Sequence, residues 1–194
     1  MWISIVTFKF KSADLVAEEK NYFGHHVHLA KQMPGLRMYW TGKLRATRKL
    51  VPERYRAGII VFDDSAAAAA AMMGSAPALI ADTHEHMTQL HNHTADVDPV
   101  LPLRAGAGRD CFLSIATFQA RDPERYRERH VGLARRLPGL SGYAVGPGLA
   151  VLEWPSYFAM REAYRSPHGR EVLTSADELC ADVRLTYVDA RTEV

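Results

Sequence analysis

Two histidines stand at matching places in the sequence, each four residues after a tyrosine. Tyr22 precedes His26 in the first pair, and Tyr126 precedes His130 in the second. An imidazole gains or loses a proton near neutral pH, so it is suited to acid–base catalysis. Each pair is therefore a candidate centre for proton transfer, and the elements around it decide whether it can act as one.

The sequence around each histidine occurs twice. Residues 22–39 and 126–143 are identical at nine of eighteen positions, at a constant offset of 104. Ser4–Phe8 (SIVTF) matches Ser114–Phe118 (SIATF) at four of five positions. Chance would give about one identity in the longer match, given ordinary protein composition. The chain is therefore a duplication, and two copies are too few for a solenoid.

Periodic patterns in the first copy predict alternating strands and helices. In chain order these are Trp2–Phe8 (strand), Asp14–Met33 (helix), Leu36–Leu44 and Tyr55–Phe62 (strands), an alanine-rich helix through Met73, Ala78–Met87 (short helix) and Leu90–Val97 (strand). Pro34-Gly35 ends the first helix, and Asp63-Asp64-Ser65 is a good N-cap for the alanine-rich one.

The second copy repeats this order. The predicted ranges are Asp110–Gln119 (strand), Pro123–Leu137 (helix), Leu140–Val145 and Leu149–Trp154 (strands), Ser156–Arg165 and Gly169–Leu179 (helices) and Val183–Val188 (strand). Asp122 is the expected cap, with Pro123 at the first helical position. The order β-α-β-β-α-β is the ferredoxin-like pattern.

The sequence predicts an α+β fold made of two ferredoxin-like units. The first spans residues 1–97, a linker 98–109 (DPVLPLRAGAGR) follows, and the second spans residues 110–194. Helices cover one face of each sheet, so the other apolar face must be buried elsewhere. We expect the two units to pack sheet to sheet as an intramolecular barrel, with a cavity between the sheets.

The repeated histidine falls on the apolar stripe of its helix. Positions i, i+4, i+7, i+8 and i+11 share one helix face, and they are Tyr22, His26, Leu29, Ala30 and Met33 in one copy and Tyr126, His130, Leu133, Ala134 and Leu137 in the other. Two interpretations are open. Each histidine is either a core residue satisfied by neighbouring polar groups or a partly buried acid–base group.

The motif Tyr-x3-His-x2-Leu-Ala-x2-(Met/Leu)-Pro-Gly-Leu-x2-Tyr resembles the EthD domain of the dimeric α/β-barrel superfamily. It is carried by His26–Tyr39 (HVHLAKQMPGLRMY) and His130–Tyr143 (HVGLARRLPGLSGY). The resemblance covers both halves, which implies a pseudo-dimer within one chain and allows a further homodimer. It also implies small, often cofactor-free enzymes, among them polyketide cyclases, dehydratases, decarboxylases and lactone isomerases, with other members linked to oxidative degradation.

The resemblance maps the family's histidine onto His26 and His130 and its tyrosine onto Tyr39 and Tyr143. These four are the candidate catalytic residues. His26 is favoured because His25 and His28 give the first copy a richer acid–base set. Candidate substrate-binding residues are Trp2, Phe8, Tyr22, His28, Trp40, Phe118, Tyr126 and Trp154. The aromatic residues on strands are either plain core or a cavity wall, since a shift of one residue reverses the face.

Four histidines between His84 and His93 suggest a metal site. Their spacing, H-x-H-x4-H-x-H, matches no metal motif with a mechanical rationale, and the second copy has no counterpart. No C-x-x-C-H occurs, which leaves only haem held without a covalent bond by a barrel histidine. We predict neither metal nor cofactor, with these two alternatives open.

The composition narrows the classes of protein to which this chain could belong. The net charge is only +2 and no basic stripe with aromatic residues occurs, which argues against nucleic-acid binding. No apolar run reaches membrane length, and two cysteines favour a reducing, cytoplasmic setting. The expected function is a cofactor-independent lyase, cyclase or isomerase acting on an apolar, aromatic or polyketide-like metabolite, in biosynthesis or degradation. The alternatives are an oxidative, monooxygenase- or haem-linked protein and a non-catalytic ligand-binding protein.

Overall fold

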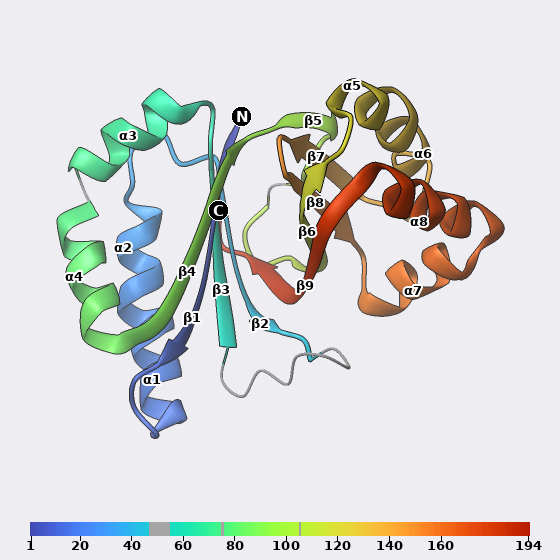
Figure 1. The fold of residues 1–194 in the computed structure, drawn as a ribbon. Coiled ribbons are helices and arrows are strands. Elements are labelled where there is room, and N and C mark those ends of the chain that lie inside the picture. Colours follow the sequence, from blue (N-terminus) through green and yellow to red (C-terminus); the bar gives the residue numbers. More distant parts are fainter. Residues whose placement is uncertain (47–54, 75, 105) are drawn as a thin grey trace. The chain divides into compact units, whose positions relative to one another are not determined.

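The two sequence copies fold into two units of mixed α and β structure. The computed structural model describes residues 1–46, 55–74, 76–104 and 106–194 (Figure 1). The first unit comprises Met1–Asp96, Ala105–Arg109 and Arg191–Val194, and the second comprises Val97–Arg104 and Asp110–Ala190. Each unit therefore includes a short segment that follows the other copy in the sequence.

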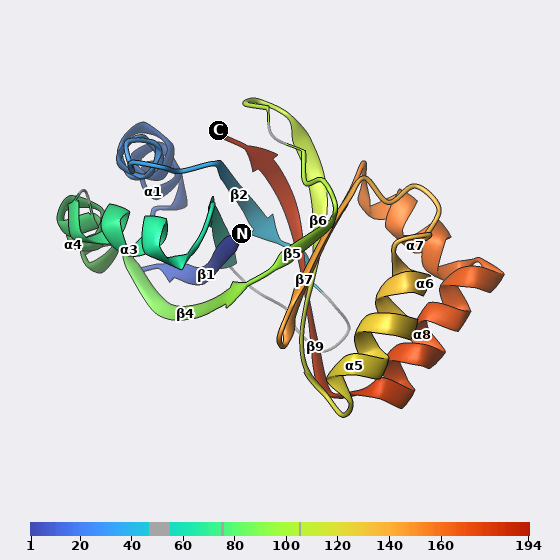
Figure 2. The same ribbon diagram turned by 90° about the horizontal axis from the view of Figure 1, so that it is seen from above.

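The first unit has the strand order β4-β1-β3-β2, and its helices cover one face of this sheet (Figures 1 and 2). β1 is antiparallel to both of its neighbours, and Ser4 lies opposite Ile60 and Thr94. The elements are β1 (Trp2–Phe10), α1 (Leu15–Asn21), the π-helical turn η1 (Tyr22–His26), α2 (Val27–Lys31), β2 (Met38–Leu44), β3 (Tyr55–Phe62), α3 (Ser65–Gly74), α4 (Ala76–His86) and β4 (Met87–Asp96).

The second unit has the strand order β9-β6-β8-β7-β5, again with helices on one face (Figure 2). Its elements are β5 (Asp98–Leu101), β6 (Asp110–Ala120), α5 (Pro123–Arg125), the π-helical turn η2 (Tyr126–Val131), α6 (Gly132–Ala134), β7 (Gly142–Gly146), β8 (Leu149–Trp154), α7 (Tyr157–Arg165), α8 (Pro167–Leu179) and β9 (Cys180–Thr192). The predicted α+β class and the ferredoxin-like order of both copies are confirmed.

The first helical stretch of each copy begins at an aspartate cap, which was predicted for Asp122 and is also present at Asp14. The side chains of Asp14 and Asp122 each accept a hydrogen bond from the backbone N–H three residues later, at 3.1 and 3.0 Å. Gly35 and Gly139 follow the prolines that end the two helical stretches, with φ of +74° and +77°. Glycine adopts this left-handed conformation without steric cost, so it lets the chain turn back toward the sheet.

Two local features differ from the prediction. The segment expected to be a linker contains β5, which pairs with β7, so that Asp98 lies opposite Val145. The predicted first helix of each copy contains a π-helical turn, and the backbone N–H of Val27 bonds to the carbonyl of Tyr22, five residues earlier. Such turns are rare in helices and often occur at functional sites.

Each unit buries its own apolar core between its helices and its sheet. The stripe residues Tyr22, Ala30 and Met33 pack with Phe8 and Phe62 in the first unit. Their counterparts in the second unit pack among Phe112, Leu152 and Trp154. The helix face that carries the repeated histidine therefore lies against the sheet of the same unit.

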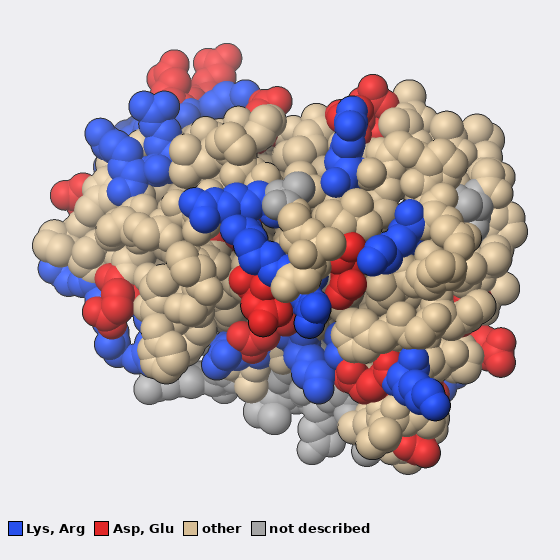
Figure 3. Space-filling view, turned by 180° about the vertical axis from the view of Figure 1, so that it is seen from behind, with Lys and Arg blue, Asp and Glu red and all other residues tan. Residues whose placement is uncertain are grey.

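The surface carries charges of both signs. On the face drawn in Figure 3, Lys and Arg side chains alternate with Asp and Glu among uncharged residues. This agrees with the net charge of +2. In the part of the chain that the structure describes, no helix is long and apolar enough to cross a membrane.

Candidate functional site

The repeated histidines are both buried, and each lies flat against its tyrosine. The ring centroids of Tyr22 and His26 are 5.1 Å apart with an interplanar angle of 16°. Those of Tyr126 and His130 are 4.9 Å apart at 22°. Both pairs sit within the π-helical turns, so the two copies retain one local geometry. Their surroundings, however, differ.

In the first unit, a buried carboxylate contacts the histidine. Nδ1 of His26 lies 2.7 Å from Oδ2 of Asp82, on α4. Burial lowers the pKa of His26 below its usual value, while the hydrogen bond to Asp82 and the charge of Asp82 oppose this shift. With Nδ1 bonded to the carboxylate, Nε2 lies on the far side of the ring from Asp82 and is the atom suited to exchange a proton with a substrate.

Further acidic and imidazole groups surround this pair. The exposed His25 reaches within 3.7 Å of Asp82, and His86 within 4.0 Å. His86 also lies 3.2 Å from the buried carboxylate of Glu18. The charges of His25 and His86 add to the effect of burial and lower the pKa of His26.

The tyrosine of the first pair contacts the second candidate tyrosine. The hydroxyls of Tyr22 and Tyr39 are 3.1 Å apart and buried. Burial raises the pKa of both, that of Tyr39 to well above its usual value. Tyr39 therefore stays protonated at neutral pH and retains a proton to donate.

A buried arginine supports this pair from β3. The guanidinium of Arg56 lies 5.1 Å from the ring centroid of Tyr22. Its Nε donates to Oε1 of Glu19 at 3.0 Å, Nη2 forms a second bond to the same carboxylate, and Nη1 donates to Thr41 at 3.2 Å. These bonds fix the guanidinium beside the aromatic ring, where its charge interacts favourably with the π-system.

Tyr22, His26 and Tyr39 border a cavity of about 270 Å³ inside the first unit. Its lining includes His26 and Tyr39, together with apolar side chains such as Val6, Phe8 and Ile60. Imidazole and hydroxyl groups on an otherwise apolar wall are the elements expected of a small-molecule site.

The second unit lacks the carboxylate partner. Nδ1 of His130 is buried and has no hydrogen-bond partner within the described residues. Burial alone lowers the pKa of His130 to about 4. Burial also raises the pKa values of Tyr126 and Tyr143, whose hydroxyls interact as their counterparts do. His130 is therefore neutral at pH 7.

His130 and Tyr143 line a second cavity of about 510 Å³ within the second unit. It lies between the helices and residues of the sheet such as Ser114, Ala116 and Leu152. The expected location between two sheets is thus wrong for both histidines, because an apolar helix stripe packs on the sheet of its own unit. The packing of one sheet on the other stays a prediction.

The eight residues predicted to bind the substrate divide into two groups. Phe8 and Tyr22 line the first cavity, and Phe118 and Tyr126 line the second. The remaining four are not among the lining residues: Trp2 packs on Phe62, exposed His28 contacts Gln32, Trp40 is fully buried, and the indole N–H of Trp154 donates to Ser114.

The four histidines from His84 to His93 lie in different surroundings. His84 lines the first cavity, His86 contacts Glu18, and His91 and His93 lie on β4 opposite Thr7 and Ile5. Across residues 1–46, 55–74, 76–104 and 106–194, no group of three or more His, Cys, Asp or Glu side chains is placed to hold a metal ion.

Sequence reasoning did not find Asp82 or Arg56. Asp82 meets His26 across 56 residues of chain, and no spacing rule links positions so far apart. The second copy offers no matching carboxylate as a signal, because Asp82 lies five residues before β4 and the residue five before β9 is Ser175.

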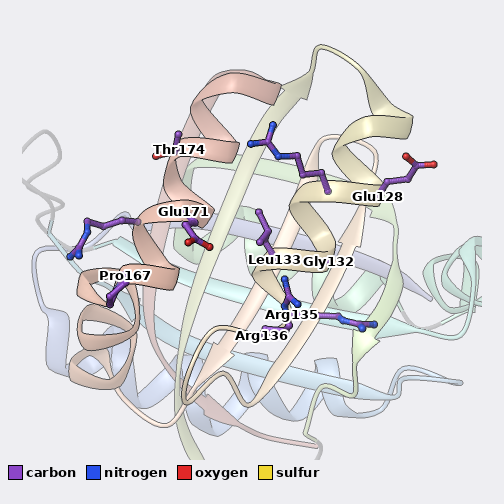
Figure 4. Close-up of a pocket in the computed structure, with 10 residues that line it drawn as sticks. Glu128, Gly132, Leu133, Arg135, Arg136, Pro167, Glu171 and Thr174 are labelled. Carbon is purple, nitrogen blue, oxygen red and sulfur yellow. The ribbon is translucent and has the colours of Figure 1, made fainter.

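A further hollow of about 840 Å³ lies at the surface of the second unit (Figure 4). It is bordered by η2, α6 and α8 and combines arginines with Glu128 and Glu171. It contains none of the candidate catalytic residues. Its mixed charge and open form distinguish it from the two cavities beside the histidines.

Sequence comparison finds no matching family model and no matching curated protein. Structural comparison does find similar proteins. A protein from Fusobacterium nucleatum, described as a putative monooxygenase, is 11% identical and has a TM-score of 0.72, covering 99% of this chain and 93% of the other. The chain has the dimeric α/β-barrel fold.

Two further structures are similar to this dimeric α/β-barrel chain. One is described as a putative chlorite dismutase, with 10% identity, a TM-score of 0.63 and coverage of 100% of this chain and 94% of the other. An EthD family protein from Bacillus halodurans is 20% identical, with a TM-score of 0.41, over 48% of this chain and 97% of the other. The likeness to the Fusobacterium nucleatum protein and to the protein described as a putative chlorite dismutase establishes the fold alone at these identities.

Proposed function

We propose that the first unit is the catalytic half of a small-molecule enzyme in which His26 transfers a proton. The hydrogen bond of 2.7 Å between His26 and Asp82 carries this proposal. A carboxylate on one ring nitrogen fixes the tautomer and the orientation of the imidazole, and it stabilises the imidazolium formed when the other nitrogen takes a proton.

The lining of the cavity suits an apolar, aromatic or polyketide-like substrate. Its walls are largely aliphatic and aromatic, and Tyr39 supplies a hydroxyl. That hydroxyl would donate a hydrogen bond to an oxygen that becomes enolate-like when His26 removes a proton from the adjacent carbon. Cyclisation, dehydration and isomerisation need only such a base and such a hydrogen-bond donor.

We also propose that the two copies act as a pseudo-dimer within one chain. The low cysteine content favours a cytoplasmic setting.

An oxidative reaction is the second candidate. It is favoured by the description of the similar Fusobacterium nucleatum protein as a putative monooxygenase. The deprotonated substrate would then react with molecular oxygen, with His26 in the same role as base. A CH2 group of the substrate would become a carbonyl with one oxygen atom, the other oxygen atom would leave as water, and the substrate would supply all four electrons.

Haem fits neither histidine well. The cavity beside His26, at about 270 Å³, is smaller than the roughly 300–1,000 Å³ of sites for drug-sized ligands. The second ring nitrogen of a metal-bound histidine is almost always hydrogen-bonded, whereas Nδ1 of His130 has no such partner among the described residues.

The test is an activity screen with matched histidine variants. The protein is incubated in deuterium oxide with a panel of enolisable aromatic ketones and aromatic polyketides, and products are followed by mass spectrometry. Loss of water, deuterium uptake without other change and gain of oxygen distinguish dehydration, isomerisation and oxygenation. His26→Asn keeps a donor toward Asp82 but removes Nε2, so we expect conversion to fall by about 10²–10⁴-fold.

His91→Asn is the control, because His91 is exposed on β4 and lies outside the cavity. It should convert the panel at the rate of the unmodified protein. No conversion by the unmodified protein, or full activity in His26→Asn, would overturn the proposal.

A further inference from the structure

The second unit holds a cavity that the proposed reaction does not use. Its volume of about 510 Å³ falls within the range of small-molecule sites. Its lining is mostly apolar and aromatic, with Phe118, Leu152, Met160 and Val172 among the contributing side chains. Such a wall accommodates a flat hydrophobic molecule.

His130, a residue that lines this cavity, has a buried ring nitrogen without a partner in the described part of the chain. His130 is 9% exposed, and its Nδ1 has no hydrogen-bond partner among the residues that the structure describes. Buried polar groups in proteins are nearly always hydrogen-bonded, because an unsatisfied one loses its interaction with water without replacement. A ligand hydroxyl or carbonyl next to this nitrogen would supply the missing bond.

The charged residues of the lining are more exposed than His130. Arg165 and Asp177 are exposed, and Arg161 is half-buried, with its guanidinium 5.6 Å from the ring centroid of Tyr157. Among the described residues, no carboxylate is hydrogen-bonded to Nδ1 of His130 as Asp82 is to Nδ1 of His26, so a charged ligand group next to His130 would be buried without compensation.

We propose that this cavity is a separate binding site for an uncharged aromatic molecule that carries one hydroxyl group and bonds to His130 through it. The neutral imidazole suits an uncharged partner, because one ring nitrogen donates and the other accepts. The site lies wholly within the second unit. It does not depend on catalysis in the first unit, so either proposal can fail alone.

Isothermal titration calorimetry with 2-naphthol and naphthalene tests the site. The two probes share an apolar skeleton and differ by one hydroxyl. We expect the protein to bind 2-naphthol about tenfold more tightly, the value of one buried hydrogen bond. His130→Phe keeps an aromatic ring against Tyr126 but removes the nitrogen atoms, so it should bind both probes with equal affinity.

His26→Phe is the matched control in the first copy and should keep the tenfold preference. The ring ¹⁵N resonances of His130, assigned with the variant, should shift on addition of 2-naphthol and not of naphthalene. Ala150→Leu, which places a larger side chain in the same cavity, should abolish binding of both probes. It replaces His130→Phe as the test if that variant fails to fold.

Absence of saturable binding to the unmodified protein would overturn the proposal. Loss of the preference in His26→Phe with its retention in His130→Phe would overturn it too, since the hydroxyl would then be recognised in the first unit.

Discussion

Asp82 Oδ2 lies 2.7 Å from Nδ1 of His26, whereas Nδ1 of His130 has no hydrogen-bond partner in the described part of the chain. The two histidines occupy equivalent positions and stack on equivalent tyrosines. The protein therefore holds one imidazole beside a carboxylate and one in an apolar pocket, and their proton chemistry differs accordingly.

Replacement of Asp82 by asparagine should lower the pKa of His26 further. Burial already lowers this pKa, and the hydrogen bond and charge of Asp82 are the groups that oppose the shift. Titration of the ring resonances by NMR measures the change. Asp177→Asn, at an exposed position in the second unit, should leave the pKa of His26 as it is. An unchanged or raised pKa in Asp82→Asn would show that the carboxylate is not charged beside His26.

His130 should make the protein less stable as the pH falls from 7 to 4.5. Its pKa is about 4 in the folded protein and about 6.5 when unfolded, so the unfolded chain binds the extra proton over this interval. The expected loss in the free energy of unfolding is roughly 2 kcal/mol from this group. Urea unfolding at pH 7 and at pH 4.5 gives two free energies of unfolding, and the loss is the difference between them. It should be smaller by that amount in His130→Phe, and an equal loss in both proteins would contradict the burial of His130 as a neutral ring.

The hydroxyls of Tyr22 and Tyr39 should show a clear dependence on each other. Tyr22→Phe leaves the buried hydroxyl of Tyr39 without this partner, so we expect a loss of about 1–3 kcal/mol in the free energy of unfolding. The double variant Tyr22→Phe/Tyr39→Phe removes both polar groups and should be no less stable than the single variant. Urea unfolding of the three proteins measures this. Additive losses would show that the hydroxyls do not depend on one another.

Gly169 should not tolerate a side chain at the start of α8. A Cβ atom there would lie 2.1 Å from the carbonyl oxygen of Ala163, so backbone must move. Gly169→Ala should lower the free energy of unfolding by about 1–3 kcal/mol, the usual cost of overpacking. Gly132→Ala is the matched control, because that helical position has open space around it. It should be neutral or raise stability by up to about 1 kcal/mol. Thermal unfolding of both variants makes the comparison, and equal midpoints would contradict the close approach.

Local patterns in the sequence predict much of this fold. The stripe of Tyr22, His26 and Met33 is buried as the helical period requires, and Asp14 and Asp122 cap the expected helices. The π-helical turns could not be predicted, because inserting one residue in a turn leaves the apolar period on either side almost intact. β5 was not predicted because it is short and contains Pro99, which edge strands tolerate.

Only those contacts of the candidate site that lie within one helix could be predicted from the sequence. The pairing of Tyr22 with His26 follows from residues four apart on one helix face. The contact of His26 with Asp82 joins elements distant in the sequence, and so does the contact of Arg56 with Glu19. Such contacts depend on tertiary packing, which periodicity does not specify.

Each unit contains a segment that follows the other copy in the sequence, Arg191–Val194 in the first unit and Val97–Arg104 in the second. Glu193 donates its backbone N–H to Tyr39 at 2.7 Å, and Leu101 lies opposite Tyr143 on β7. Both candidate tyrosine strands therefore have a neighbour that follows the other copy. One copy alone would leave this edge open, and an open strand edge is a template for pairing with a second molecule. Because the covering segments belong to the same chain, the pairing seen here does not depend on protein concentration.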